Sequence, residues 1–175
     1  MISNNVEAST LFEIMSKDKV DPDEMMFHMN NDLYQTKTAG MFVTSILGEY
    51  NLLTDEIRWV NAGHQPAIIR QKSGNYSEFN SSSTPLGVIK HKDKSVYKLE
   101  KTKLNDGRFY VFTDGLSESL NDKGEEIGIE GSIKIIENNF NSDLKKQLRD
   151  VTTETINTAQ NNSLSDDLTL VAIGK

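Results

Sequence analysis

Cysteine is absent from the 175-residue sequence, so a disulfide framework, a thiol nucleophile and a thiolate zinc site are all excluded. Any metal ion must therefore be held by oxygen or imidazole ligands. Long apolar runs are also missing, since no stretch approaches the roughly 20 residues that cross a bilayer. The first residues carry no basic segment followed by an apolar one, as a secretory signal would. We therefore expect a cytoplasmic chain with no membrane segment.

Clusters of lysine and arginine are missing too, and the formal net charge is −7. A nucleic-acid backbone rewards clustered positive charge, so we expect no nucleic-acid partner and favour a protein or a small molecule instead. The sequence shows no internal repeat and no long linker. Its length suits one ordinary domain, predicted to span residues 1–175.

Helical spacing of apolar residues predicts a first helix over Val6–Lys17. Asp21 and Pro22 then place a proline at the first position of a second helix, which ends between Thr36 and Gly40. Two further helices are predicted at residues 127–138 and 143–159. β-Branched and aromatic residues predict strands at residues 41–47, 57–61, 67–70, 76–79, 95–99, 108–112 and 168–173. The first three strands have the pattern of an antiparallel meander, and the order of elements indicates an α+β protein with mostly antiparallel strands.

Acidic residues stand at the ends of two predicted strands. Asp114 directly follows the strand over residues 108–112, and Asp166 and Asp167 directly precede the last strand. If those strands are antiparallel neighbours, the carboxylates meet at one rim of the sheet, where they repel one another unless protons or a cation offset their charge. Oxygen ligands without sulfur suit Mg²⁺ or Mn²⁺. An alternative stays open, because Asp-Gly is a common turn pair and Ser-Asp-Asp can simply hydrogen-bond loop backbone.

Five short motifs occur in order along the chain: Gly40-Met41-Phe42-Val43-Thr44, Asn61-Ala62-Gly63-His64-Gln65-Pro66, Pro85-Leu86-Gly87, Thr113-Asp114-Gly115 and Asp166-Asp167-Leu168-Thr169. Together they resemble the signatures of PPM-type metal-dependent protein serine/threonine phosphatases of the sporulation stage II protein E and sigma-B regulator (SpoIIE/RsbU-like) branch. The resemblance implies a β-sandwich of mostly antiparallel strands flanked by helices. It also implies two Mg²⁺ or Mn²⁺ ions, and a metal-activated water that attacks phosphoserine or phosphothreonine.

The same resemblance assigns roles to four residues. Asp114 and Asp166 match the family's metal ligands, and they would act in catalysis through the metal-bound water. His64 and Asp167 are accessory candidates. A lone histidine at a turn more often forms a local hydrogen bond, and Asp167 could face solvent or support the site from outside the ligand shell.

One family signature is not found, a Gly-Asp-Val-Ser-Gly-His-Gly-like motif whose aspartate bridges the two metals. We therefore expect an N-terminally truncated domain that is weakly active or inactive alone, with an exposed sheet edge that promotes homodimer formation. The partner implied by the resemblance is a phosphorylated regulatory protein, an anti-sigma factor antagonist. The alternative is a non-catalytic pseudophosphatase module that only binds or signals.

Overall fold

The computed structural model describes residues 20–36 and 40–174, so the helix predicted over Val6–Lys17 lies outside the described residues. The chain divides into two compact units. The first contains Met1–Pro66 and Phe79–Asn105, and the second contains Ala67–Glu78 and Asp106–Lys175. One domain over residues 1–175 stays a prediction. No described helix is long and apolar enough to cross a bilayer.

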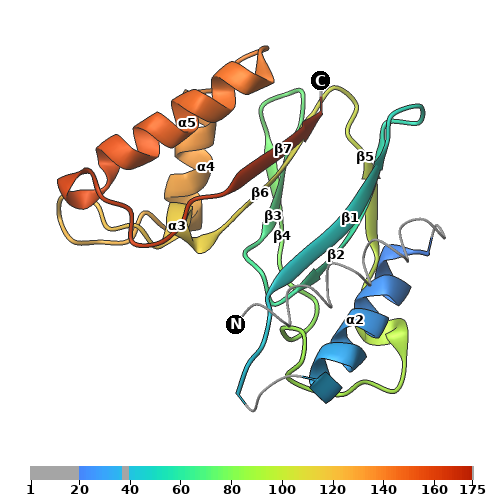
Figure 1. Ribbon diagram of the computed structural model, residues 1–175. Coiled ribbons are helices and arrows are strands. Elements are labelled where there is room, and N and C mark those ends of the chain that lie inside the picture. Colours follow the sequence, from blue (N-terminus) through green and yellow to red (C-terminus); the bar gives the residue numbers. More distant parts are fainter. Residues whose placement is uncertain (1–19, 37–39, 175) are drawn as a thin grey trace. The chain divides into compact units, whose positions relative to one another are not determined.

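The first unit combines a helix with a three-stranded antiparallel sheet (Figure 1). The sheet order is β1-β2-β5, and the unit also contains the short 3-10 helix η1. The bounds are α2 Pro22–Thr36, β1 Ser45–Asn51, β2 Glu56–Ala62, η1 Lys94–Val96 and β5 Glu100–Lys103. The core of this unit takes Met26 and Leu33 from α2, and it also contains Val60, Leu86 and Tyr97. Burial of this apolar stripe is what holds α2 on the sheet.

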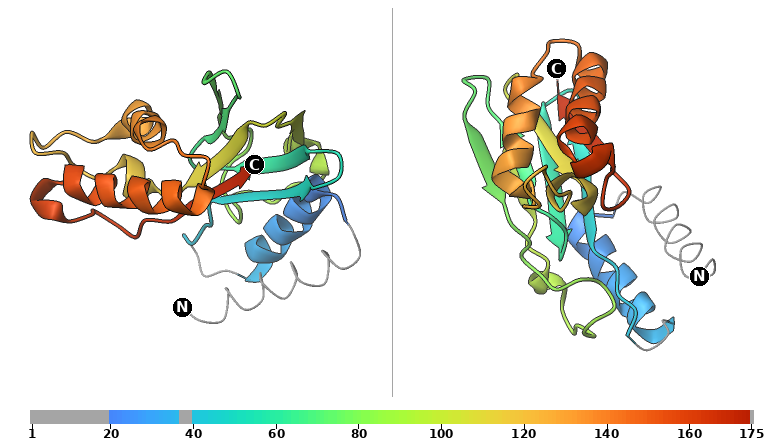
Figure 2. Two further views of the ribbon diagram at one scale, coloured as in Figure 1. Left: turned by 90° about the horizontal axis from the view of Figure 1, so that it is seen from above. Right: turned by 90° about the vertical axis from the view of Figure 1, so that its left-hand side faces the viewer.

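The second unit is built on a four-stranded sheet of order β4-β3-β6-β7. Its elements are β3 Ala67–Arg70, β4 Tyr76–Phe79, β6 Arg108–Phe112, α3 Asp114–Ser117, α4 Gly128–Asn138, α5 Leu144–Thr158, η2 Gln160–Asn162 and β7 Leu170–Gly174. Helices α4 and α5 contact each other, and the right-hand view of Figure 2 shows them next to each other. Apolar side chains of α4 and α5 pack with those of β3 and β6 to form the core, as Ile136, Val151, Ile68 and Tyr110 illustrate.

A buried arginine ties β6 to the connection between α4 and α5. The Arg108 side chain donates hydrogen bonds to the carbonyl oxygens of Asn141 and Ser142 and to Oε1 of Gln147. Both Arg108 and Gln147 are almost fully buried. Burial of a guanidinium is tolerated only with such pairing, so this network fixes the end of α4 and the start of α5 against the sheet.

The α+β class with mostly antiparallel strands is confirmed. The condition that the strand over residues 108–112 and the last strand are antiparallel neighbours is met. Three details of the prediction are wrong. The first strand, predicted over residues 41–47, begins later, because β1 covers Ser45–Asn51. Residues 67–70 do not extend a meander, because β3 pairs with β6 in the other sheet. Residues 95–99 are not a strand, because the Asp93 carboxylate accepts a hydrogen bond from the Ser95 amide and starts η1 instead. The strand begins five residues later, at Glu100.

Candidate metal centre

The pairing of β6 with β7 brings two acidic segments to one end of the second unit. Phe112, the last residue of β6, lies opposite Leu170, the first residue of β7. Asp114 opens α3 just beyond β6, and Asp166 and Asp167 lie in the loop just before β7, at the same end of the sheet (Figure 1). The segments that carry Asp114 and Asp166 therefore lie at one end of the sheet, as expected when the two strands are antiparallel neighbours.

Thr113 joins the two segments through its backbone and its side chain. Its amide donates to the carbonyl of Thr169 at 3.0 Å. Its hydroxyl donates to the carbonyl of Asp167 at 2.8 Å and accepts from the amide of Thr169 at 2.8 Å. The two acidic segments are thus hydrogen-bonded to each other through backbone groups and hydroxyls rather than through their carboxylates.

Gly115 allows the two segments to come close together. A Cβ at this position would lie 2.6 Å from the carbonyl oxygen of Asp167 and 2.8 Å from that of Asp166, closer than real side chains pack. Nearby, the fully buried hydroxyl of Ser119 donates to the Gly115 carbonyl at 2.7 Å and accepts from the Ser165 amide at 3.4 Å. The sequence identified Asp114 and Asp166 but gave no signal for Ser119, because a serine in a short turn has no distinctive pattern.

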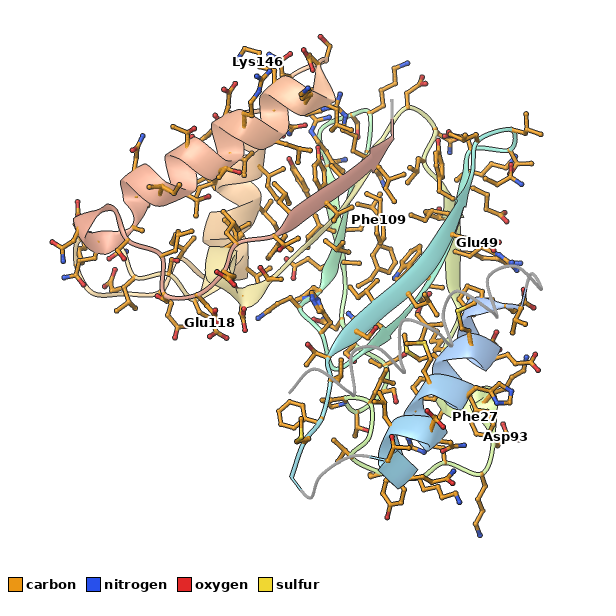
Figure 3. The ribbon with its side chains drawn as sticks, in the orientation of Figure 1. Phe27, Glu49, Asp93, Phe109, Glu118 and Lys146 are labelled. Carbon is orange, nitrogen blue, oxygen red and sulfur yellow. The ribbon has the colours of Figure 1, made fainter. Side chains whose placement is uncertain are left out.

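The carboxylates themselves face solvent. Asp114, Asp166 and Asp167 are all exposed, and no hydrogen bond from another described residue reaches the carboxylate of Asp114. One oxygen of Asp166, Oδ1, accepts from the Asp167 amide at 2.7 Å. Glu118, also exposed, lies just after α3 on the same rim (Figure 3).

These residues fit a hard divalent cation in part. Carboxylate oxygens at a solvent-exposed rim are the ligand type that Mg²⁺ and Mn²⁺ take. Within the described ranges, however, no group of three or more Asp, Glu or His side chains is placed to hold an ion. The described residues therefore do not form a complete ligand set, and the assignment of Asp114 and Asp166 as metal ligands stays a prediction. An open hollow of about 480 Å³ borders the rim, lined by Ile156, Ser163, Leu164, Asp166, Asp167 and Leu168.

His64 belongs to the first unit, whereas the acidic rim belongs to the second. The structure places it in a loop shaped by Asn61. The Asn61 side chain accepts from the His64 amide at 3.0 Å and donates to the Gln65 carbonyl at 3.0 Å. The half-buried imidazole makes a hydrogen-bond contact of 3.3 Å from Nδ1 to the Gln65 carbonyl. Local hydrogen bonding therefore accounts for the geometry of this motif, and an accessory role for His64 stays a prediction.

The motifs around His64 and Pro85 form one packed cluster in the first unit. Gly63 has a φ of +69°, and a Cβ there would lie 2.4 Å from Cγ of Pro85. The next loop is held by α2, where the fully buried Asn30 accepts from the Gly87 amide at 2.9 Å and donates to the Ile89 carbonyl at 3.0 Å. The helical pattern of α2 had marked only its apolar residues, so Asn30 was missed.

Comparison with known proteins identifies the family. The model of the stage II sporulation protein E (SpoIIE) family matches residues 5–175. The chain belongs to the SpoIIE family. The predicted resemblance to PPM-type phosphatases of the SpoIIE/RsbU-like branch is thereby confirmed.

Individual relatives agree with this assignment. The phosphoserine phosphatase RsbU of Bacillus subtilis (strain 168) is 25% identical over 158 residues, covering 88% of this chain and 45% of RsbU. The PP2C phosphatase domain of SpoIIE from Bacillus subtilis, solved with a fragment of its regulatory domain, superposes with a TM-score of 0.80 at 18% identity. That match covers 98% of this chain and 49% of the solved one.

RsbX, solved in complex with magnesium, superposes with a TM-score of 0.64 at 15% identity, over 97% of this chain and 71% of the solved one. These likenesses show that the fold is that of PP2C-type phosphatase domains. The chain spans less than half the length of the curated relatives it matches.

Proposed function

We propose that this SpoIIE-family domain hydrolyses phosphoserine or phosphothreonine on a regulatory protein, with Mg²⁺ or Mn²⁺ held at Asp114 and Asp166. The observation that carries the proposal is the shared rim formed by the ends of β6 and β7. There, exposed carboxylates lie on two segments that are joined by strand pairing and by hydrogen bonds between the Thr113 hydroxyl and backbone groups. The name of RsbU as a phosphoserine phosphatase and the magnesium bound to RsbX support the reaction and the metal class.

The roles of the residues follow from their chemistry. A bound divalent ion supplies hydroxide near neutral pH and offsets negative charge on the phosphoryl group. Asp114 and Asp166 contribute anionic oxygens that hold such an ion, and the amide of Asp167 fixes the orientation of the Asp166 carboxylate. We assign Asp167 a supporting role outside the ligand shell. His64 is an accessory candidate for metal or phosphate.

The partner in this proposal is a phosphorylated regulatory protein of the anti-sigma factor antagonist class, met in the cytoplasm. Its support is the likeness to RsbU and the acidic character of the chain, which disfavours nucleic acid. Homodimer formation through the edge of a sheet belongs to the same proposal. In the first unit β1 is an edge strand, and it lacks the lysines that protect the other edge strand, β5, at Lys101 and Lys103.

We further propose that this chain alone is a weak phosphatase. Two exposed carboxylates bind a divalent ion less tightly than a full ligand set, because water must supply the remaining positions. The rival function is a non-catalytic module that keeps the fold and signals by binding. The phosphatase and the non-catalytic module share the same fold. Only the phosphatase predicts metal-dependent hydrolysis that is lost when Asp114 is replaced.

The experiment is Mn²⁺-dependent hydrolysis of a phosphoserine peptide. It compares this chain with Asp114→Asn. We expect slow hydrolysis by the chain and loss of this hydrolysis in Asp114→Asn. Asp150→Asn is the matched control, because the Asp150 carboxylate pairs with Lys146 within α5. Metal-dependent hydrolysis that survives Asp114→Asn contradicts the assignment, and inactivity of the chain itself supports the binding module.

A further inference from the structure

The hydroxyl of Thr113 accepts the hydrogen bond that a backbone carbonyl accepts in a regular sheet. In a regular antiparallel ladder, the carbonyl of Thr113 would accept from the amide of Thr169. That carbonyl is already engaged, because it accepts from the Leu116 amide at 3.1 Å in the first turn of α3. The hydroxyl replaces it as acceptor at 2.8 Å. One side chain thereby lets β6 end, α3 begin and the ladder to the 165–169 segment continue by one more residue.

The proton of the same hydroxyl is also used. It is donated to the Asp167 carbonyl at 2.8 Å, so Thr113 Oγ1 acts as donor and acceptor toward the segment that carries Asp166. Ser119 makes the matching link on the other side of Gly115. It bonds the Gly115 carbonyl and the Ser165 amide, and Ser165 Oγ in turn donates to the Glu118 carbonyl at 3.2 Å. Asp114 and Asp166 are therefore held between two hydroxyl links.

These links avoid the carboxylates. Every hydrogen bond between the 113–119 and 165–169 segments described above involves a backbone group, and none consumes an oxygen of the Asp114 carboxylate. The hydroxyl links hold the two segments together while leaving the oxygens of the Asp114 carboxylate open to a cation.

We propose that Thr113 is a positioning residue for metal binding, whose hydroxyl sets the placement of the Asp166 carboxylate relative to Asp114. Ser119 supports it from the buried side. The inference rests on the proposed function, because it requires these two aspartates to share a cation. Groups that orient metal ligands typically change metal affinity by about 10- to 100-fold when they are removed.

The test uses this chain and Mn²⁺ alone, read by paramagnetic broadening of backbone amide signals, which detects weak binding. In the wild type, the signals of Asp114 and Asp167 should broaden together over one range of Mn²⁺ concentration. Thr113→Val keeps the shape but removes the hydroxyl, and it should raise the required Mn²⁺ concentration about tenfold or more. Thr113→Ser should restore binding close to the wild type.

Hydrogen exchange gives a readout that needs no metal. The Thr169 amide should exchange faster in Thr113→Val and normally in Thr113→Ser. Thr152→Val is the control, because the half-buried Thr152 hydroxyl bonds only the Leu148 carbonyl of its own helix. It should change neither readout.

The outcomes separate the two proposals. Equal Mn²⁺ dependence in the wild type and Thr113→Val, with faster Thr169 exchange in the variant, would show that the link is structural only and would overturn this inference alone. No broadening at either aspartate in the wild type would overturn the metal assignment and this inference with it.

Discussion

Gly115 and Asp167 approach so closely that a Cβ on Gly115 would lie 2.6 Å from the Asp167 carbonyl oxygen. The contact joins the turn that carries Asp114 to the loop that carries Asp166. It is backbone against backbone, so no side-chain rotation can relieve an added methyl group. Gly115 is the glycine of the Thr113-Asp114-Gly115 motif, and the close approach gives a steric reason for a glycine at this position.

Gly115→Ala should therefore force the two segments apart. We expect the free energy of unfolding to fall by about 1–3 kcal/mol, the usual cost of overpacking a tight contact. The measurement is chemical denaturation. Gly131→Ala is the comparison, because a Cβ there would lie 2.8 Å from the Cγ2 methyl of Ile127, the residue before α4, and not from backbone, and alanine favours the helix. If Gly115→Ala is as stable as the control, the close approach does not constrain this rim.

Much of the strand pattern was predictable, because segments rich in β-branched and aromatic residues favour strands. Residues 67–70, 76–79 and 108–112 were predicted with the bounds that the structure shows. The strand at Glu100 was placed too early because its sequence, Glu-Lys-Thr-Lys, is charged, as an edge strand often is. Pairing between strands far apart in sequence, such as β3 with β6, has no local signal.

Asn30 should be essential for the loop that follows Pro85. Replacing it by leucine leaves the buried Gly87 amide without its partner, and a buried unpaired group costs about 1–3 kcal/mol. The Ile89 carbonyl also loses its partner, but Ile89 is exposed, so water can replace it. We expect lower stability and faster hydrogen exchange at Gly87 in Asn30→Leu. The control is Gln35→Leu, since Gln35 is an exposed residue of the same helix. Unchanged exchange at Gly87 would show that the loop holds its shape without α2.

Gln147 should stabilise the second unit through Arg108. Its Oε1 accepts from Arg108 and from the Tyr110 hydroxyl, the latter at 3.2 Å. Gln147→Leu removes this buried acceptor and should lower the free energy of unfolding by about 2–4 kcal/mol, because one of the affected donors is charged. Gln160→Leu, at an exposed position, serves as control. Equal stability of the two variants would contradict the role of the network.

The Arg70–Glu137 pair predicts a dependence of stability on pH. Two hydrogen bonds from Arg70, at 2.9 and 3.3 Å, hold the pKa of Glu137 below its usual value of 4.5, and the Tyr76 hydroxyl lowers it further. The folded pKa lies below the unfolded one, so the pair stabilises above pH 4.5 and this contribution is lost as the pH falls through the folded pKa. The stability gap between the wild type and Glu137→Gln should therefore narrow in acid. A gap that stays constant or widens there would contradict the prediction.

Only the part of the candidate site that depends on residue type, namely its acidic residues, could be predicted from the sequence. Asp114 and Asp166 were singled out because acidic residues at strand ends are conspicuous. The pairing of β6 with β7 places their segments at one rim, and their role as metal ligands stays a prediction. Thr113 stood in a motif without a role of its own, and Ser119 and Asn30 were not singled out. Their roles depend on which backbone group each hydroxyl or amide reaches, and that is a property of the fold, not of the local sequence.

The most direct test of the central claim is a double-mutant cycle on Asp114 and Asp166, with Mn²⁺-dependent hydrolysis of a phosphoserine peptide as the readout. If both carboxylates hold one catalytic centre, Asp114→Asn, Asp166→Asn and the double variant should lose activity to nearly the same extent, because the second change removes nothing that the first has left. Losses that multiply, or activity that survives either change, would contradict a shared metal centre at this rim.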